Sequence, residues 1–429
     1  MTQLQSARND KITREMKRVA QVEGINAEAL RRQIGAGTAV IPANNAHGRI
    51  KPVGIGQGLR MKVNANIGTS KIKSTLKIEL RKLTTALEAG ADTIMDLSTG
   101  GNLDRTRRAI MERCDAPVGT VPIYQTAIES GGIEAMTIGR YLKILERHAQ
   151  DGVDFITIHA GVTQRAFPLI EKRVMKCVSR GGSFLLGWMK HHGKENFIYE
   201  NFDEVLELAK EFDITISLGD GLRPGCIEDA TDKAQIEELK TLGLLARRAR
   251  DKGVQVMIEG PGHIPLNEIE KNVRLQKKYS DNAPFYVLGP LPTDVAAGYD
   301  HIACAIGGAL AGMHGADFLC YVTPKEHVGL PDISDVREGV VAAKIAAHIA
   351  DLANGNKIAL KQDHKMGLAR ARVDWPGMLK YAIDRERFAE LKRDECTKNP
   401  ALDSAHYCSM CGPFCAFEVL EKSSGVRPT

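Results

Sequence analysis

Short apolar runs of strand length alternate with amphipathic helical stretches through most of this 429-residue chain. Successive runs are separated by about 24 to 40 residues, which is enough for a strand, a helix and two short connections. Helical periodicity is clear over Lys73–Leu87, Ile138–Gln150, Phe202–Phe212 and Ile236–Lys252. The apolar runs fall at 63–69, 92–98, 118–124, 155–161, 177–183, 214–220, 254–260, 285–291 and 318–324.

This alternation predicts a (β/α)8 barrel. Repeated βα units wind into a ring of eight parallel strands, and the nine candidate runs are one more than the ring needs. The run at 177–183 is the weakest candidate, because it is short and rich in glycine. An open, doubly wound sheet is the alternative, since alternation alone does not distinguish a closed ring from an open sheet.

The segments outside the barrel complete a four-part organisation. Residues 1–60 are expected to form an N-terminal appendage of helices and loops, and residues 61–330 the catalytic barrel. Residues 331–397 carry further helical patterns and are expected to form a C-terminal helical domain. Residues 398–429 begin without periodicity, and we expect a flexible tail that carries a cysteine motif.

Composition excludes several classes of function. No stretch approaches the ~18 apolar residues of a membrane span, and the first residues lack a signal-peptide run, so a cytoplasmic location is expected. The net charge of +5 is small and aromatic residues are only 5%, which argues against a nucleic-acid surface, although a mildly positive cleft would suit a phosphorylated substrate. Neither a GxxxxGKS/T element nor a GxGxxG after a strand occurs, so ATP hydrolysis and Rossmann dinucleotide binding are not expected.

Nearly every candidate strand ends in a polar or otherwise functional side chain. In a barrel these positions meet at the carboxyl ends of the strands, where the βα loops form the active site. A guanidinium beside glycine-freed backbone N–H groups suits an anionic group, although an internal salt bridge between Asp220 and Arg223 is the alternative for that pair. One such residue is usually a helix cap, but many in phase predict one pocket. The candidates are Asn66, Met95, Tyr124, His159, Ser179, Arg180, Gly181, Asp220, Arg223, Glu259 and Tyr286.

Two histidines follow consecutive apolar runs. His263 ends the segment EGPGH, and His327 ends TPKEH. In a barrel the two imidazoles would face the same mouth. Two neutral imidazoles can hold Zn2+ with the remaining positions left to water or substrate. A single histidine at such a position is more often an ordinary loop residue, so the zinc hypothesis depends on the matching placement of the pair.

Three of the nine cysteines lie together near the C-terminus. Cys408, Cys411 and Cys415 have the spacing C-x2-C-x3-C, and a Gly-Pro turn lets them converge on one inorganic centre. Three thiolates leave one iron of an iron–sulfur cluster open to a small molecule, whereas structural zinc takes four ligands. The alternative is a zinc knuckle completed by His406 or a distant cysteine. A disulfide is less expected in a reducing compartment.

Long segments of the chain resemble the ThiC family of radical S-adenosylmethionine enzymes. The resemblance runs from about Val40 through Ala353 and resumes at the cysteine motif. The segments that carry it are NANIG (64–68), SRGG (179–182), SLGDGLRPG (217–225), VMIEGPGH (256–263), APFYVLGPL (283–291), GYDH (298–301) and CYVTPKEH (320–327).

The resemblance implies a homodimer of (β/α)8 barrels in which the C-terminal tail serves its own or the neighbouring subunit's active site. It implies that the eleven strand-end residues contact the substrate, that His263 and His327 bind zinc, and that the three clustered cysteines hold a [4Fe–4S] cluster. It also implies that an external one-electron reductant drives cleavage of S-adenosylmethionine to methionine and a 5′-deoxyadenosyl radical. That radical would abstract hydrogen from 5-aminoimidazole ribonucleotide.

Departures from typical pyrimidine-forming members decide the expected product. Those members resemble this chain but have cysteine at the position of Ala160, proline at Ala297 and Thr-Ser at Ala303-Cys304, and they differ over Ala43–His47. The departures predict the benzimidazole-forming branch of the family (BzaF-like), which makes 5-hydroxybenzimidazole, the precursor of a cobamide lower ligand. The alternative product is 4-amino-5-hydroxymethyl-2-methylpyrimidine phosphate, for thiamine. A non-catalytic zinc-binding scaffold is the alternative outside the enzymes.

Overall fold

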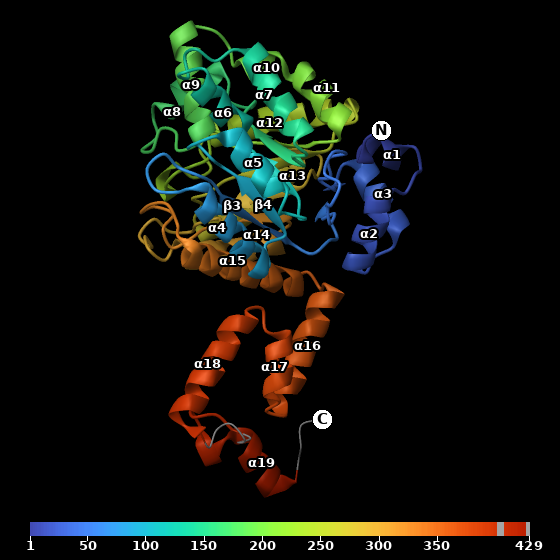
Figure 1. The fold of residues 1–429 in the computed structure, drawn as a ribbon, viewed down its shortest axis with the longest axis vertical. Helices are drawn as coiled ribbons and strands as arrows, with labels where there is room; N and C mark the ends of the chain where they lie inside the picture. The colour runs from blue at the N-terminus through green and yellow to red at the C-terminus, as the bar shows by residue number, and fades with distance from the viewer. Residues whose placement is uncertain (401–406, 426–429) are drawn as a thin grey trace. The chain divides into compact units, whose positions relative to one another are not determined.

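Eight parallel strands close into a barrel: β3 (Lys62–Ile67), β4 (Thr93–Asp96), β5 (Val118–Thr120), β6 (Phe155–Ile158), β7 (Thr215–Leu218), β8 (Val256–Gly260), β9 (Phe285–Leu288) and β10 (Phe318–Cys320). The order around the ring follows the sequence, and β10 pairs with β3 to close it. The predicted (β/α)8 barrel is therefore confirmed (Figure 1). The computed structural model describes residues 1–400 and 407–425.

Aromatic rings fill the interior of the barrel. Phe155 and Phe318 meet edge to face with their ring centroids 6.4 Å apart, and Tyr286 stacks on Phe318 at 4.2 Å. The ring of Phe155 needs the space beside Gly119, where an added Cβ would lie 2.2 Å from it. Because the strands are buried on both faces, they are apolar runs rather than alternating patterns.

Helices form the outer ring of the barrel (Figure 1). The candidate run at 177–183 is not a strand: Ser179 is the N-cap of α9 (Arg180–His192), and its hydroxyl accepts from the N–H of Gly182 at 3.1 Å. Serine is a preferred N-cap, so the local sequence begins a helix there. The other helices of this region are α4 (Leu76–Glu88), α5 (Leu103–Met111), α6 (Pro122–Glu129), α7 (Ile138–Gln150), α8 (Phe167–Ile170), α10 (Phe197–Glu200), α11 (Phe202–Phe212), α12 (Lys233–Asp251), α13 (Ile269–Tyr279), α14 (Asp300–Met313) and α15 (Ile333–Ala353).

The N-terminal segment packs at the amino ends of the barrel strands. It comprises the helices α1 (Gln3–Arg8), α2 (Arg14–Glu23) and α3 (Ala27–Ala36) and the short antiparallel pair β1 (Ala39–Val40) and β2 (Ile55–Gly56). The Thr2 hydroxyl donates to the Gly253 carbonyl at 2.6 Å, just before β8. The Asn44 N–H donates to Asp154 at 3.0 Å, just before β6. These contacts leave the carboxyl ends of the strands open.

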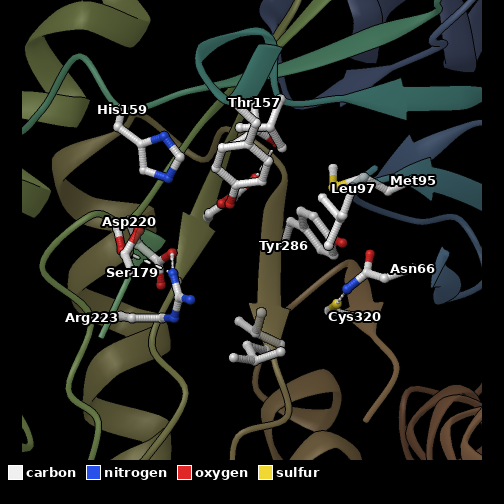
Figure 2. A pocket seen from close by; sticks show the side chains of 16 residues that line it. Asn66, Met95, Leu97, Thr157, His159, Ser179, Asp220, Arg223, Tyr286 and Cys320 are labelled. Carbon is white, nitrogen blue, oxygen red and sulfur yellow. Dashed lines mark hydrogen bonds and ion pairs between the residues drawn. The ribbon is translucent and has the colours of Figure 1, made fainter. Parts of the chain in front are cut away.

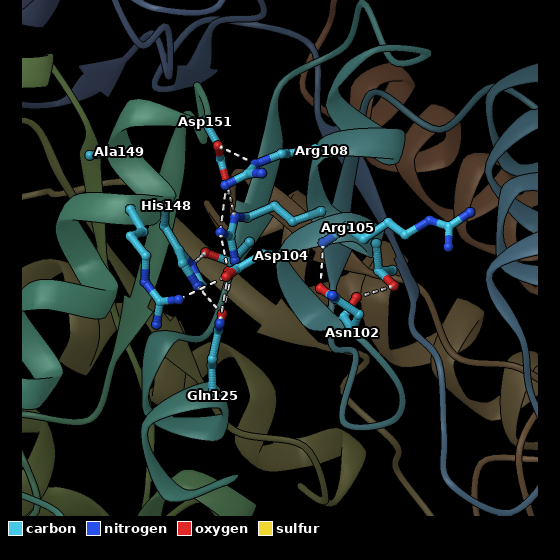
Figure 3. Close-up of polar contacts among 12 residues, drawn as sticks. Asn102, Asp104, Arg105, Arg108, Gln125, His148, Ala149 and Asp151 are labelled. Atoms are coloured by element: carbon cyan, nitrogen blue, oxygen red, sulfur yellow. Dashed lines mark hydrogen bonds and ion pairs between the residues drawn. The ribbon is translucent and has the colours of Figure 1, made fainter. Parts of the chain in front are cut away.

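A buried polar network ties α5, α6 and α7 to the end of β5 (Figure 3). His148 contacts the Thr120 hydroxyl through Nδ1 and the Gln125 side-chain oxygen through Nε2, both at 2.8 Å. Arg107, which is 1% exposed, donates to the same Gln125 oxygen at 2.9 Å and to Asp104 at 2.7 Å. The network fixes the start of α6, and with it Tyr124, relative to the barrel.

By its contacts the chain divides into two units, Met1–Asp351 and Leu352–Thr429. The second contains α16 (Lys357–Ala371), α17 (Trp375–Tyr381), α18 (Arg385–Lys398) and α19 (Ala416–Ser424). The Lys392 ammonium lies 4.1 Å from the centre of the Trp375 ring and joins α18 to α17. His406, the proposed extra ligand of a zinc knuckle, lies outside the described residues. None of the described helices is long and apolar enough to cross a membrane.

Candidate active site

A pocket lies at the carboxyl ends of the barrel strands (Figure 2). It is open to solvent on one side, and both polar and apolar side chains line it. Leu97, Val121, Thr157, Gly260, Val287, Leu288 and Cys320 form part of its wall. Nine of the eleven residues predicted from strand ends complete it: Asn66, Met95, Tyr124, His159, Ser179, Asp220, Arg223, Glu259 and Tyr286. The structure thus brings these nine together, while their role as substrate ligands stays a prediction.

The two remaining predicted residues lie directly beside the pocket. The Arg180 guanidinium stacks over the Tyr124 ring at 4.9 Å. Gly181 packs against the His159 imidazole, and an added Cβ would lie 2.3 Å from that ring. Both residues belong to the first turn of α9, whose free N–H groups and positive dipole end favour an anion. This corner of the pocket can therefore hold a phosphate.

One wall of the pocket carries buried acidic groups and a buried guanidinium. The Arg223 guanidinium donates to an Asp220 carboxylate oxygen at 3.2 Å, and the other oxygen of Asp220 has no partner (Figure 2). Burial raises the pKa of Asp220 to about 8 despite the nearby Arg223. Glu259 accepts from the hydroxyls of Thr157 and Ser217 at 2.7 and 2.8 Å. The pairing considered for Asp220 and Arg223 therefore forms within the pocket, as a hydrogen bond from the guanidinium to the carboxyl group.

His159 is a neutral imidazole in this wall. Burial, together with the charge of Arg223, lowers the pKa of His159 to about 3. Its Nδ1 is buried without a hydrogen-bond partner. This nitrogen lies against the start of α9, since an added Cβ on Gly181 would be 2.3 Å from it, so it is closed off from the open pocket.

The opposite wall is formed by β3, β9 and β10 (Figure 2). Asn64 donates to the Tyr286 hydroxyl at 2.8 Å, and Asn66 donates to the Cys320 sulfur at 3.1 Å. Burial raises the pKa of Cys320 to about 12, so it is a thiol. Cys320 is not among the predicted residues, even though it begins the segment CYVTPKEH. Its position inside the last apolar run was the available signal.

The two predicted zinc histidines lie close together. The ring centroids of His263 and His327 are 5.1 Å apart. Nδ1 of His263 contacts Asp294 at 2.7 Å, and Nδ1 of His327 contacts Asp300 at 2.9 Å. Carboxylates that bind the Nδ1 hydrogen leave Nε2 as the ligating nitrogen, an arrangement common in zinc sites. These residues therefore fit a zinc ion, and spacing alone could not have found the two aspartates.

The cysteine motif lies on a short turn in the second unit. Cys408 and Cys411 are exposed, Cys415 is half-buried, and all three are free thiols. The Gly412 N–H donates to the Cys408 carbonyl at 3.0 Å, which begins the turn at Gly412–Phe414. Within residues 1–400 and 407–425, no three histidine, cysteine or acidic side chains are grouped closely enough to hold a metal ion. The donor set itself fits a cluster that takes three thiolates.

A closed barrel with a small, deep, mixed polar and aromatic pocket at its carboxyl face is the architecture of a barrel enzyme that acts on a small molecule. The chain belongs to one family of such enzymes. The model described as "Radical SAM ThiC family" matches residues 2–422. This match confirms the resemblance to the ThiC family that the sequence motifs indicated.

Curated relatives are similar along their whole length. A "Phosphomethylpyrimidine synthase" of Desulforamulus reducens is 53% identical over 434 residues, covering 100% of this chain and 99% of the relative. One of Caldanaerobacter subterraneus subsp. tengcongensis is 54% identical over 435 residues, covering 100% of both. Among solved structures, a dihydropteroate synthase from Stenotrophomonas maltophilia has a TM-score of 0.44 at 11% identity, covering 73% of this chain and 98% of that one. This last likeness is too remote to bear on function.

The expected benzimidazole product is wrong. Relatives that share about half of all residues over the full length carry the name of the pyrimidine-forming enzyme, so a role in cobamide synthesis is not supported. The structure gives a physical reason: none of Ala43–His47, Ala160, Ala297, Ala303 or Cys304 lines the pocket. Ala303 and Cys304 are 4% and 2% exposed within α14, and Ala297 is exposed on the surface. These departures therefore leave the residues that line the pocket unchanged.

Proposed function

We propose that the chain is a phosphomethylpyrimidine synthase, which converts 5-aminoimidazole ribonucleotide to 4-amino-5-hydroxymethyl-2-methylpyrimidine phosphate for thiamine synthesis. The observation that carries this proposal is the identity of 53–54% to enzymes of that name over the full length of the chain. The chemistry of the barrel pocket supports it, because a ribonucleotide needs an anion site and polar groups for its base and sugar.

The first turn of α9 is the proposed phosphate site. Ser179, Arg180 and Gly181 offer a hydroxyl, a guanidinium and backbone N–H groups at the positive end of the helix dipole. The buried pair of Asp220 and Arg223 would orient the sugar or the amino group. Asn66, Met95, Tyr124, His159, Glu259 and Tyr286 would complete the contacts to the substrate.

Zinc is the proposed metal at His263 and His327. Burial lowers the pKa of His263, which keeps the imidazole neutral and able to bind a metal. Two protein ligands leave positions open for water or a polar group of a ligand, as in sites that act on substrates. With zinc bound, these positions would orient a ligand at the mouth of the barrel.

The segment 398–429 is the proposed cluster-binding tail, with Cys408, Cys411 and Cys415 as ligands of a [4Fe–4S] cluster. Such a cluster supplies reductive cleavage of S-adenosylmethionine, which generates the radical that starts the reaction. The barrel residues bind the nucleotide and hold its reacting atoms away from water. A homodimer and an external one-electron reductant are part of the same proposal.

Growth complementation tests the proposed function. A bacterial strain that lacks its own phosphomethylpyrimidine synthase should grow without thiamine or the pyrimidine when it expresses this chain under anaerobic conditions. The Cys411→Ala variant is the matched control and should not restore growth. Growth of the strain with the intact chain only when the pyrimidine is supplied would contradict the proposal, provided that the protein is present and carries its cluster.

A further inference from the structure

Glu238 lies behind the pocket rather than in it. It belongs to α12, its side chain is 3% exposed, and it is not among the residues that line the pocket. One of its carboxylate oxygens accepts from the backbone N–H of Leu222 at 2.7 Å. Leu222 is itself 2% exposed. Loss of the Glu238 carboxyl would therefore remove a hydrogen-bond acceptor from a buried N–H, which costs stability.

Two segments that carry pocket residues pack against this side chain, and a third packs against one of them. Gly161, three residues beyond β6, packs so closely that an added Cβ would lie 3.1 Å from Glu238 Cγ. A Cβ on Gly221 would lie 3.2 Å from Glu238 Oε1. On the other side of the same loop, a Cβ on Gly182 would lie 2.3 Å from the Gly221 carbonyl oxygen. The loop 219–225 is therefore clamped between Glu238 and the first turn of α9.

A second polar contact on the backbone beside Gly221 comes from a thiol. Cys177, two residues before the N-cap of α9, donates from its sulfur to the Gly221 carbonyl at 3.3 Å. Glu238 thus binds the N–H that follows Gly221, while Cys177 binds the carbonyl of Gly221 itself. Together they hold the backbone directly between Asp220 and Arg223.

The charge state of Glu238 suits a supporting role. Burial and the nearby Asp220 raise the pKa of Glu238 to about 8, and its Oε1 has no hydrogen-bond partner. At neutral pH it is then mostly an uncharged carboxyl that still accepts from Leu222. An uncharged acceptor can hold the loop without placing a negative charge behind a phosphate site.

We infer that Glu238 is a positioning residue for substrate binding: its hydrogen bond to Leu222 holds the loop 219–225 against the first turn of α9. In this way it sets the geometry of Asp220 and Arg223 relative to the anion site. The inference rests on the proposed function in that the ligand of the pocket is 5-aminoimidazole ribonucleotide. The hold on the loop itself does not depend on that ligand.

Hydrogen exchange of the ligand-free protein tests the hold on the loop. Glu238→Met fills a similar volume but has no strong acceptor, Glu238→Gln keeps the acceptor, and Glu237→Gln makes the same change at the neighbouring, less buried position. Loss of the acceptor should speed exchange in peptides that contain Leu222 by about tenfold, while both glutamine variants exchange like the parent protein. Glu238→Asp, whose shorter side chain reaches less far, should give a smaller change in the same direction and serves if the methionine variant does not fold. Unchanged exchange in the methionine variant, or in the aspartate variant that replaces it, would overturn the inference.

Calorimetric titration with 5-aminoimidazole ribonucleotide, in the absence of S-adenosylmethionine, tests the effect on the pocket. Glu238→Met should bind about fivefold more weakly or worse, and Glu238→Gln should bind within about twofold of the parent. Recovery by glutamine separates positioning from a general loss of stability. Equal affinity in the methionine and parent proteins would overturn the inference. If the parent protein binds no ribonucleotide, the proposed function fails, and the exchange measurement alone decides the role of Glu238.

Discussion

At the scale of single residues, the pocket contains a neutral histidine, His159, and two buried carboxyl groups of raised pKa. Burial depresses the pKa of His159 and raises those of Asp220 and Glu259, so burial reduces charge on every one of these groups. Arg223 is the group whose charge persists. The wall therefore offers one fixed positive charge and several groups that can exchange protons with a bound ligand.

Cys411 is expected to be essential for cleavage of S-adenosylmethionine. Cys411→Ala leaves two thiolates, too few to hold a cluster with one open iron. The variant should form no detectable 5′-deoxyadenosine, while its circular dichroism and thermal unfolding match the parent protein. Cys396→Ala, a free cysteine on α18 outside the motif, is the matched control and should retain cleavage. Cleavage by the Cys411 variant would show that the cluster ligands are assigned wrongly.

Asp300 is expected to strengthen metal binding at the histidine pair. Its carboxylate holds Nδ1 of His327 at 2.9 Å and leaves Nε2 for the metal. Loss of such a partner commonly costs a factor of ~10 to 100 in metal affinity, so Asp300→Ala should weaken Co2+ binding by about that factor. The visible absorption of Co2+ measures this without catalysis. Asp281→Ala, at an exposed position, is the control, and equal affinity in both variants would contradict the role of Asp300.

At the scale of secondary structure, the buried network of α5, α6 and α7 makes stability depend on pH through His148. Burial and the charge of Arg107 lower the pKa of His148 well below its ordinary value. The unfolded chain therefore takes up a proton near pH 6.5 that the folded chain does not, and stability falls as the pH drops below that value. The slope from this one residue is at most ~1.4 kcal/mol per pH unit.

Denaturant unfolding between pH 5 and pH 8 measures this slope. His148→Gln should lose less stability on the acidic side, because glutamine takes up no proton when the chain unfolds. Comparing its slope with that of the parent protein cancels the contributions of the other titrating groups. His191→Gln, the same change at a half-exposed histidine, should leave the slope as it is. An unchanged slope in His148→Gln would show that His148 takes up its proton in the folded protein.

The sequence predicted most of the elements but not all of their types. Eight of the nine apolar runs are barrel strands, because a strand buried on both faces gives a continuous apolar run. The prediction of a strand at 177–183 was wrong, because the small residues of this segment fit the start of a helix as well as they fit a strand. The glycine-rich helix α14 and the short helices α1 and α17 were not predicted, since periodicity is weak over short or small-residue segments.

The candidate site was predictable to a similar extent. Strand ends in a barrel converge by topology, so the order of strands along the sequence was enough to group Asp220, Glu259 and Tyr286 in one pocket. Pairings that depend on tertiary packing, such as Asp300 with His327 or Glu238 with Leu222, have no local signal in the sequence. The departures at Ala303 and Cys304 misled for the same reason: the sequence did not show that these residues are buried in α14 behind the pocket wall and do not line the pocket.

At the scale of the whole molecule, one chain combines a barrel that has a pocket at the carboxyl ends of its strands with a second unit that carries the cysteine motif. The similarity to phosphomethylpyrimidine synthases covers both units, which argues that they evolved to act together. The central claim is therefore about the product of the complete enzyme rather than about either unit.

The most direct test is to identify that product. The reconstituted protein would be incubated anaerobically with S-adenosylmethionine, dithionite and 5-aminoimidazole ribonucleotide. The products would be separated by liquid chromatography and their masses measured by mass spectrometry. We predict a phosphorylated pyrimidine with the mass of 4-amino-5-hydroxymethyl-2-methylpyrimidine phosphate, together with 5′-deoxyadenosine. A benzimidazole without phosphate, or 5′-deoxyadenosine with the ribonucleotide left intact, would contradict the account.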